Sequence, residues 1–123
     1  MRTFTMTIDH LPSRKLMPNR ISGKFWGTRA RESKIAKEEA YFLARALWHE
    51  EPMQKAKISY VFHLTNHRVR DIDGIILALK PVVDGIVEAG VIARDDCWHL
   101  TLGSARPELD NCEKVVITIK EQP

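Results

Sequence analysis

The strongest constraint on the fold is an apolar block at residues 75–91 that contains a proline, Pro81. By its periodicity alone, such a block fits either a buried helix or a buried strand. Proline is costly inside a helix but is accepted in the first turn, where its missing N–H would have no intrahelical partner. We therefore predict a regular helix over residues 80–89, ended by Gly90, with residues 74–79 as a preceding turn or a kinked extension.

Other parts of the chain alternate between apolar and polar residues, a pattern typical of half-buried strands. The clearest of these segments are residues 4–8, 58–64 and 115–120. A further strand is expected at residues 97–102, followed by a polar connection at residues 103–111. The sequence therefore predicts a small β-sheet built from these strands.

A second helix is predicted over residues 29–49, with Thr28 as its N-cap. Its apolar residues recur at helical spacing and are expected to face the core. They are Ile35, Phe42, Leu43, Ala46 and Leu47. The elements then follow in the order β-α-β-α-β-β, which predicts an α+β fold with a small, single-layer mixed β-sheet packed against two helices. The 123 residues fit one domain of this kind.

Basic side chains are concentrated near the N-terminus. Residues 12–37 hold eight basic residues and one acidic residue, whereas the net charge of the whole chain is +3. A cationic segment of this kind binds polyanions, because each neutralised phosphate releases counterions. The alternative is a solvated, solubilising loop, and the charge pattern by itself leaves both interpretations open. The basic loop at about residues 12–28 has little periodicity and is predicted to be functional.

Several classes of protein do not fit the sequence. No apolar run approaches the roughly 18 residues needed to cross a bilayer, and the N-terminus lacks the apolar stretch of a signal peptide. We therefore expect a cytoplasmic protein with no membrane partner. Cys97 and Cys112 are too far apart for a zinc motif and are predicted to be reduced, half-buried thiols. The histidines are scattered, so neither a histidine-bound metal nor a small-molecule cofactor is expected.

Two pairs of aspartates are the candidates for chemistry. Asp71 and Asp73 stand at positions i and i+2 near the end of a predicted strand, and in extended backbone such side chains point to one side. Asp95 and Asp96 follow the helix that comes next, so we expect the four carboxylates to converge on one edge of the sheet. Mg²⁺ prefers oxygen ligands of this kind and can activate water for phosphodiester hydrolysis. Spacing alone slightly favours the alternative, in which these aspartates have ordinary roles in helix caps and turns.

The aspartates lie within a longer pattern: DID at residues 71–73, KPVVDGIVEAGVI at residues 80–92 and DD at residues 95–96. This pattern resembles the signature of the RusA family of Holliday junction resolvases, found in phages, prophages and bacteria. That signature reads DxDN, a lysine, KxxxD[AG]L and AGxxxxDD, and the close match covers about a fifth of this chain. Two features depart from it. Gly74 stands where the family has asparagine, and the lysine follows the second aspartate at a longer spacing than is common.

The resemblance implies a RusA-like fold and a Mg²⁺-dependent endodeoxyribonuclease, with Mn²⁺ as a possible substitute. Its substrate would be branched DNA, in particular the four-way junctions of DNA recombination and repair. By position, the resemblance implies that Asp71, Asp73 and Asp96 are the catalytic, metal-binding carboxylates and that Asp95 is an adjacent metal-binding residue. It also implies that Lys80 is the catalytic lysine.

Lys80 can be interpreted from its own surroundings as well. An ammonium beside bound metal ions stabilises the charge that develops on a phosphate. The alternative is a solvated cation at the start of a helix. Asp84 follows Lys80 by one helical turn, so we expect it to form an ion pair with Lys80 rather than to bind metal.

Nucleic-acid contacts are expected from basic residues on both sides of the predicted helix. The family tends to carry an Asn-Arg-rich loop after its first strand, which Asn19 and Arg20 resemble. The candidate nucleic-acid-binding residues are Arg14, Lys15, Asn19, Arg20, Lys24, Arg29, Arg31, Arg68 and Arg70. Phe25 and Trp26 are candidates for stacking on unpaired bases, whereas Trp48 is expected in the core.

A four-way junction is two-fold symmetric, whereas one chain of this size holds one site. A symmetric homodimer is therefore predicted, with the apolar faces at residues 75–87 as the candidate interface. Two other functions are open. The chain could be a DNA-binding module that has lost activity, as Gly74 suggests, or a nuclease for flaps or RNA.

Overall fold

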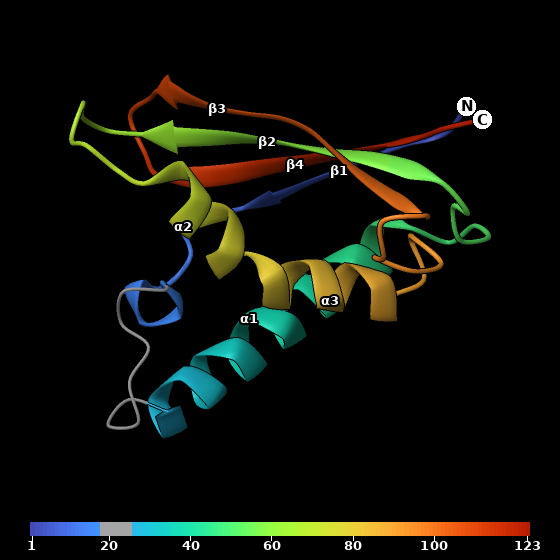
Figure 1. The fold of residues 1–123 in the computed structure, drawn as a ribbon, viewed down its shortest axis with the longest axis horizontal. Helices are drawn as coiled ribbons and strands as arrows, with labels where there is room; N and C mark the ends of the chain where they lie inside the picture. The colour runs from blue at the N-terminus through green and yellow to red at the C-terminus, as the bar shows by residue number, and fades with distance from the viewer. Residues whose placement is uncertain (18–25) are drawn as a thin grey trace.

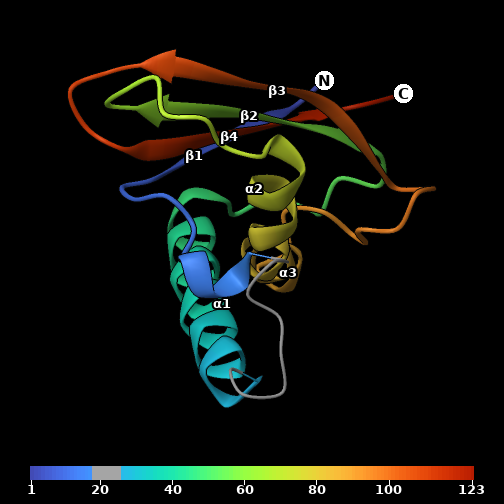
Figure 2. The same ribbon diagram turned by 60° about the vertical axis from the view of Figure 1, so that its left-hand side comes forward.

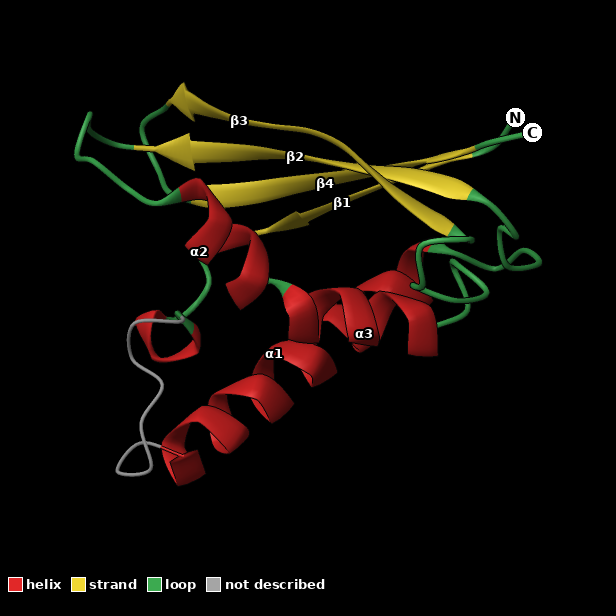
Figure 3. Ribbon diagram, in the orientation of Figure 1, coloured by secondary structure: helices red, strands yellow, loops and turns green. Residues whose placement is uncertain are grey.

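The alternating segments form one four-stranded sheet, and the helices all lie against the same face of it (Figures 1 and 3). The computed structural model describes residues 1–17 and 26–123. The elements are β1 (Thr3–Ile8), η1 (Arg14–Leu16), α1 (Trp26–Leu47), β2 (Ala56–Leu64), α2 (Ile72–Ala78), α3 (Lys80–Glu88), β3 (Leu100–Leu109) and β4 (Lys114–Glu121). The predicted α+β class with a mixed sheet over helices is confirmed.

The strand order is β1-β4-β2-β3. β4 pairs antiparallel with both β1 and β2, whereas β2 and β3 run parallel. Parallel neighbours need a long crossover connection, and α2 and α3 supply it on the covered face. Alternate residues of the two central strands point to that face and are buried. In register they are Ile58 with Ile119, Tyr60 with Ile117, and Phe62 with Val115. In Figure 2, none of the described helices lies on the opposite face of the sheet.

The apolar block forms two consecutive helices rather than one. The chain is helical over α2, turns at Leu79 and continues as α3, which has Pro81 in its first turn. The predicted helix with a kinked extension is therefore confirmed, and its predicted end at Gly90 agrees with a positive φ of 87° there. No helix that the structure describes is long and apolar enough to cross a lipid bilayer.

The predicted core face of the long helix is wrong. Phe42 is 69% exposed and Ile35 is 55% exposed, and Leu43, Ala46 and Leu47 are also on the surface. The side of α1 that faces the core instead carries alanines, with Ala40 and Ala44 fully buried. Small residues are needed because α1 lies very close to α3. A Cβ added at Gly85 would lie 2.4 Å from the carbonyl oxygen of Lys37.

Three smaller predictions are also wrong. α1 begins at Trp26, so Thr28 lies inside the helix and is not its N-cap. β3 extends through most of the segment predicted as a polar connection, because an edge strand can leave polar residues on both faces in water. Cys97 and Cys112 are exposed rather than half-buried, and both are free thiols. Trp48 is buried as expected, at 4% exposure.

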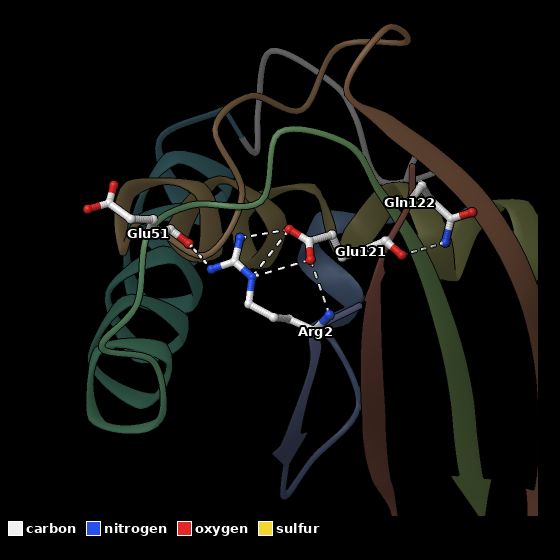
Figure 4. A network of polar contacts seen from close by, with 4 residues as sticks. All are labelled: Arg2, Glu51, Glu121 and Gln122. Carbon is white, nitrogen blue, oxygen red and sulfur yellow. Dashed lines mark hydrogen bonds and ion pairs between the residues drawn. The ribbon is translucent and has the colours of Figure 1, made fainter.

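Arg2 ties the two ends of the chain to the rest of the fold (Figure 4). Its guanidinium donates to the Glu121 carboxylate at 2.7 Å and to the Glu51 carbonyl oxygen at 2.6 Å. It also lies over the ring of Trp48, 5.1 Å from the centroid. These contacts join the start of β1, the end of β4 and the connection from α1 to β2.

We predict that Gly85→Ala lowers the free energy of unfolding by about 1–2 kcal/mol. Alanine is normally favoured over glycine in a helix by roughly 1 kcal/mol, but the cost of overpacking exceeds this gain here. Gly27→Ala in α1 is the matched control, because nothing lies within 4 Å of a Cβ at that position. Urea denaturation of both variants measures the difference. Equal or greater stability of Gly85→Ala would contradict the close packing of α1 on α3.

Candidate active site and nucleic-acid interface

A cleft of about 990 Å³ opens between the segment after β1, the loop after β2 and the start of α2. Three of the predicted nucleic-acid-binding residues, Arg14, Arg68 and Arg70, line it. Asp71, one of the predicted metal ligands, lines the same cleft. The fold therefore brings together cations from two distant segments and a carboxylate that the sequence singled out.

Asp71 and Asp73 stand at the beginning of α2, not in an extended strand. Asp71 occupies the N-cap position with extended backbone, at φ −81° and ψ 114°, and its side chain makes no capping hydrogen bond. Asp73 already lies in the first turn of the helix. The predicted alignment of the two carboxylates along a strand is therefore wrong. Both side chains are exposed, and no ion pair engages either of them among the described residues.

Lys80 is held between two carboxylates. Its ammonium donates to Asp84 at 2.7 Å, which confirms the expected pair one helical turn apart, and it also donates to Asp95. These hydrogen bonds, the one to Asp84 first, raise the pKa of Lys80 above its ordinary value. The same contact with Lys80 lowers the pKa of Asp95. Lys80 is thus a fixed cation, and Asp95 is its counter-ion.

Asp96 is engaged within its own loop. Its carboxylate lies 2.7 Å from Nδ1 of His99, accepts the N–H of Trp98 at 2.9 Å and lies 3.4 Å from Nε of Arg94. The hydrogen bond from His99 is the main reason that the pKa of Asp96 is lowered. The backbone carbonyl of Asp96 also accepts the N–H of Leu100, so this residue shapes the turn into β3.

The four aspartates do not converge within one chain. In residues 1–17 and 26–123, no group of three or more His, Cys, Asp or Glu side chains is arranged to hold a metal ion. Parallel pairing of β2 and β3 explains the separation. Ala56 lies opposite Leu100 and Leu64 lies opposite Leu109, so Asp71 follows one end of the strand pair and Asp96 precedes the other. Figure 1 shows the two connections on opposite sides of the molecule.

Asp71 and Asp73 fit a Mg²⁺ ion better than Asp95 and Asp96 do. Mg²⁺ is commonly held by one or two carboxylates, with substrate phosphate and water completing its ligands. The first pair offers two carboxylates that are exposed and that no cation of the described chain neutralises. The second pair already forms ion pairs with Lys80 and Arg94, and Asp96 is also hydrogen-bonded to His99.

A second cationic cleft, of about 430 Å³, lies on the other side of η1. Arg29 and Lys80 line it, together with Lys34 and Lys37 of α1. The helical spacing of Arg29, Ser33 and Lys37 was the available signal, because residues four apart share one side of a helix. η1 borders both clefts, with Arg14 in the larger and Leu16 in the smaller.

The other predicted contacts are more scattered. Lys15 lies 3.6 Å from Glu32, and Arg31 is exposed on α1. Asn19, Arg20, Lys24 and Phe25 lie outside the described residues, as does the side chain of Trp26. The sequence pattern did not single out four further polar residues of the larger cleft, which are His10, Thr65, Asn66 and Glu113.

Comparison of the chain with protein-family models and with curated proteins finds no match in either case. The resemblance to the RusA family therefore stays a prediction that rests on the motif residues.

We predict that Lys80→Met raises the pKa of Asp95 toward its ordinary value of 3.8, because the hydrogen bond from Lys80 is the main cause of its lowering. The stability linked to Asp95 is present above the ordinary pKa and is lost as the pH falls through the lowered one. In Lys80→Met, this pH-dependent contribution of Asp95 to the free energy of unfolding should vanish. Carbon-13 NMR titration of the carboxyl groups measures the change.

Asp110 serves as the control within the same spectra. Its pKa is lowered by the N–H of Asn111 and by Lys114, neither of which the substitution touches. An unchanged pKa for Asp95 in Lys80→Met would contradict the ion pair.

Proposed function

We propose that this chain is a Mg²⁺-dependent endonuclease that cuts branched DNA, as its resemblance to the RusA family implies. The observation that carries the proposal is the shared cleft of Asp71 with Arg14, Arg68 and Arg70. Arginines bind phosphate groups through their fork of N–H donors, and a free carboxylate beside them attracts a divalent cation to the same phosphate. Binding and hydrolysis of a phosphodiester would thus use one surface.

The residues of the chain have separate tasks in this proposal. Asp71 and Asp73 would hold the metal ion, which when bound polarises the phosphate and makes its water a better nucleophile. Arg14 and Arg68 position the DNA backbone. Lys80 lines the smaller cleft, and its ammonium would stabilise negative charge that develops on a phosphate within its reach there, in the role that the resemblance implies. Asp84 and Asp95 would then act as positioning residues, since they hold that ammonium in place.

Two cationic clefts on either side of η1 support a branched substrate in particular. A linear duplex follows one direction, whereas strands that diverge from a junction can enter both clefts at once. Each cleft contributes several cations to phosphate binding, and each phosphate contact adds to the salt dependence of the affinity. Selectivity for branched DNA would then come from shape rather than from base sequence.

A symmetric homodimer remains part of the proposal. The predicted interface at residues 75–87 is mostly unsuitable, because Ile75, Val82, Val83 and Ile86 are buried in the core of the chain itself. A two-fold symmetric dimer could nevertheless combine aspartates from two chains in one site. Asp71 lies in the connection that follows β2, whereas Asp96 lies in the connection that precedes the parallel strand β3. A partner oriented the opposite way could bring its Asp96 to the free carboxylates of the first chain.

A DNA-binding module without cleavage activity is the second candidate. The observation that favours it is the absence of a three-donor metal group among the described residues. Both candidates predict binding of branched DNA, and only the first predicts cleavage in Mg²⁺.

We predict that the protein introduces paired nicks in a labelled four-way junction in Mg²⁺ and leaves linear duplex intact. Asp71→Asn and Asp73→Asn should each lower the rate by at least about 100-fold, because they remove metal ligands. Glu38→Gln on the outer side of α1 is the matched control and should keep full activity. Flap, fork and RNA hairpin substrates in the same assay define the substrate class.

Binding must be measured beside cleavage. The two aspartate variants should still bind the junction, and EDTA should stop cleavage by the wild-type protein. Mg²⁺ should also raise the thermal midpoint of the wild-type protein more than that of Asp71→Asn, because the ion binds the native carboxylates. Tight junction binding with no cleavage at any Mg²⁺ or Mn²⁺ concentration would select the binding module.

We predict that mixing Asp71→Asn with Asp96→Asn restores part of the cleavage activity that each variant lacks alone. In a mixed dimer with shared sites, one site holds Asp71 from one chain and Asp96 from its partner, and it is intact. Random mixing gives such a dimer in about half of the cases, so roughly a quarter of wild-type sites return. Mixing two preparations of Asp71→Asn is the control. No recovery, with both variants shown to exchange subunits, would place each site within one chain.

A further inference from the structure

The larger cleft has more than the cations that a phosphate needs. Its volume of about 990 Å³ is in the upper part of the range of about 300–1,000 Å³ typical of small-molecule sites. Leu11, Pro12, Met17 and Ile75 form an apolar part of its lining. A surface that only follows a DNA backbone requires positive charge and no apolar wall. The lining therefore suits a ligand with one anionic part and one flat, apolar part.

The arginines of the cleft differ in whether they already contact polar groups of the chain itself. Arg70 donates to the carbonyl oxygen of Arg68 at 3.1 Å and lies 3.6 Å from the carboxylate of Glu113. Arg14 and Arg68 have no ion pair among the described residues, and both are exposed. Arg70 thus fixes the loop after β2, while the guanidinium groups of Arg14 and Arg68 are the two that can bind an added phosphate.

Asn66 offers a selective polar contact in the same cleft. Its Oδ1 accepts the N–H of Arg68 at 3.0 Å, which fixes the orientation of the amide. The amide nitrogen keeps its two donors available, because no hydrogen bond from it is found among the described residues. The amide N–H groups of Asn66 can therefore donate a hydrogen bond to an added acceptor, such as a carbonyl oxygen or a ring nitrogen on the edge of a base.

One wall of the cleft is anchored to α1. His10 lies with Nδ1 2.9 Å from the carbonyl oxygen of Leu11 and with Nε2 2.8 Å from the carboxylate of Glu39. Both partners are acceptors, so both ring nitrogens donate when the imidazole is protonated. This link holds the segment after β1 in place, and the apolar wall at Leu11 and Pro12 is therefore preformed.

We propose that this cleft receives one unpaired nucleotide, with its phosphate on Arg14 and Arg68, its base against the apolar wall and its base edge on Asn66. The inference rests on the proposed function, in which the nucleotide belongs to a strand at the branch point of DNA. It adds a reason for selectivity. A paired base cannot enter the cleft, whereas a base at a branch point leaves its stack at a lower cost. The neighbouring phosphate is then placed at Asp71.

The test uses a four-way junction with 2-aminopurine at the branch point, bound by the full chain in EDTA so that no cleavage occurs. Fluorescence should rise on binding, because the base leaves its stack, and should stay unchanged when the label is in the arms. Asn66→Ala should weaken binding of the intact junction by about two- to tenfold, the effect of one hydrogen bond. The same variant should leave binding of a junction with an abasic branch point unchanged.

Arg68→Gln is the companion variant, and it should weaken binding of intact and abasic junctions equally and lower the salt slope by about one. Lys57→Gln is the matched control, because Lys57 is exposed on β2 and does not line the cleft. Fluorescence that stays unchanged, or an Asn66→Ala effect equal on both junctions, would overturn the inference even if the junction is cut in Mg²⁺.

Titration with free deoxynucleoside monophosphate distinguishes a site for a free nucleotide from a site for a nucleotide within branched DNA. Chemical-shift changes at Asn66 and Arg14 without any cleavage of branched DNA would support the nucleotide site and overturn the nuclease. Absence of binding by both the free nucleotide and the branch-point base would overturn the nucleotide site itself.

Discussion

Parallel pairing of β2 with β3 is the constraint on which the rest of this structure depends. Two parallel neighbours cannot be joined by a hairpin, so the chain must travel back along the sheet before it can start β3. α2 and α3 form this return connection. They run back along β2, which has nine residues and is roughly 25–30 Å long at about 3.3 Å per residue. Residues just before the crossover are therefore separated from residues just after it. The separation of Asp71 from Asp96 is a direct consequence of this topology.

The same crossover gives the two groups of carboxylates different electrostatic environments. At the start of α2, Asp71 and Asp73 are both exposed to water, and Asp71 also lines the large cleft beside its arginines. Near the start of β3, Asp95 and Asp96 are paired with cations of their own neighbourhood, and their pKa values are lowered accordingly. A carboxylate that its own chain has already neutralised attracts an added cation less strongly. The first pair is therefore better placed than the second to attract a cation, as the proposed function requires.

Much of the fold could be predicted because its signals are local. Alternation marks β1, β2 and β4, and Pro81 marks the start of α3, since both effects act within a few residues. The ion pair of Lys80 with Asp84 is local in the same sense. The core face of α1 could not be found this way. Ala40 faces Gly85 of α3, a residue distant in the sequence, and this close approach of the two helices is what requires a small side chain there.

The candidate site shows the same division between local and distant information. The aspartates, Arg68 and Arg70 were found because they stand in or beside the motif, whereas the arrangement of the carboxylates depends on strand direction, which no single segment encodes. A crossover of this length returns the chain to the beginning of the first strand, so the expectation that Asp95 and Asp96 would meet Asp71 was wrong on topological grounds.

The large cleft could not be predicted for a similar reason, because its two walls come from segments about 50 residues apart in the sequence. Each wall is held by its own polar contacts, His10 with Glu39 on one side and Arg70 with Glu113 on the other. These contacts engage the residues that shape the cleft and leave Arg14, Arg68 and Asn66 available. A preformed site gains affinity because its side chains need not be ordered on binding. In the proposed function, the division between engaged and available groups, rather than the number of cations, distinguishes this cleft from a basic surface.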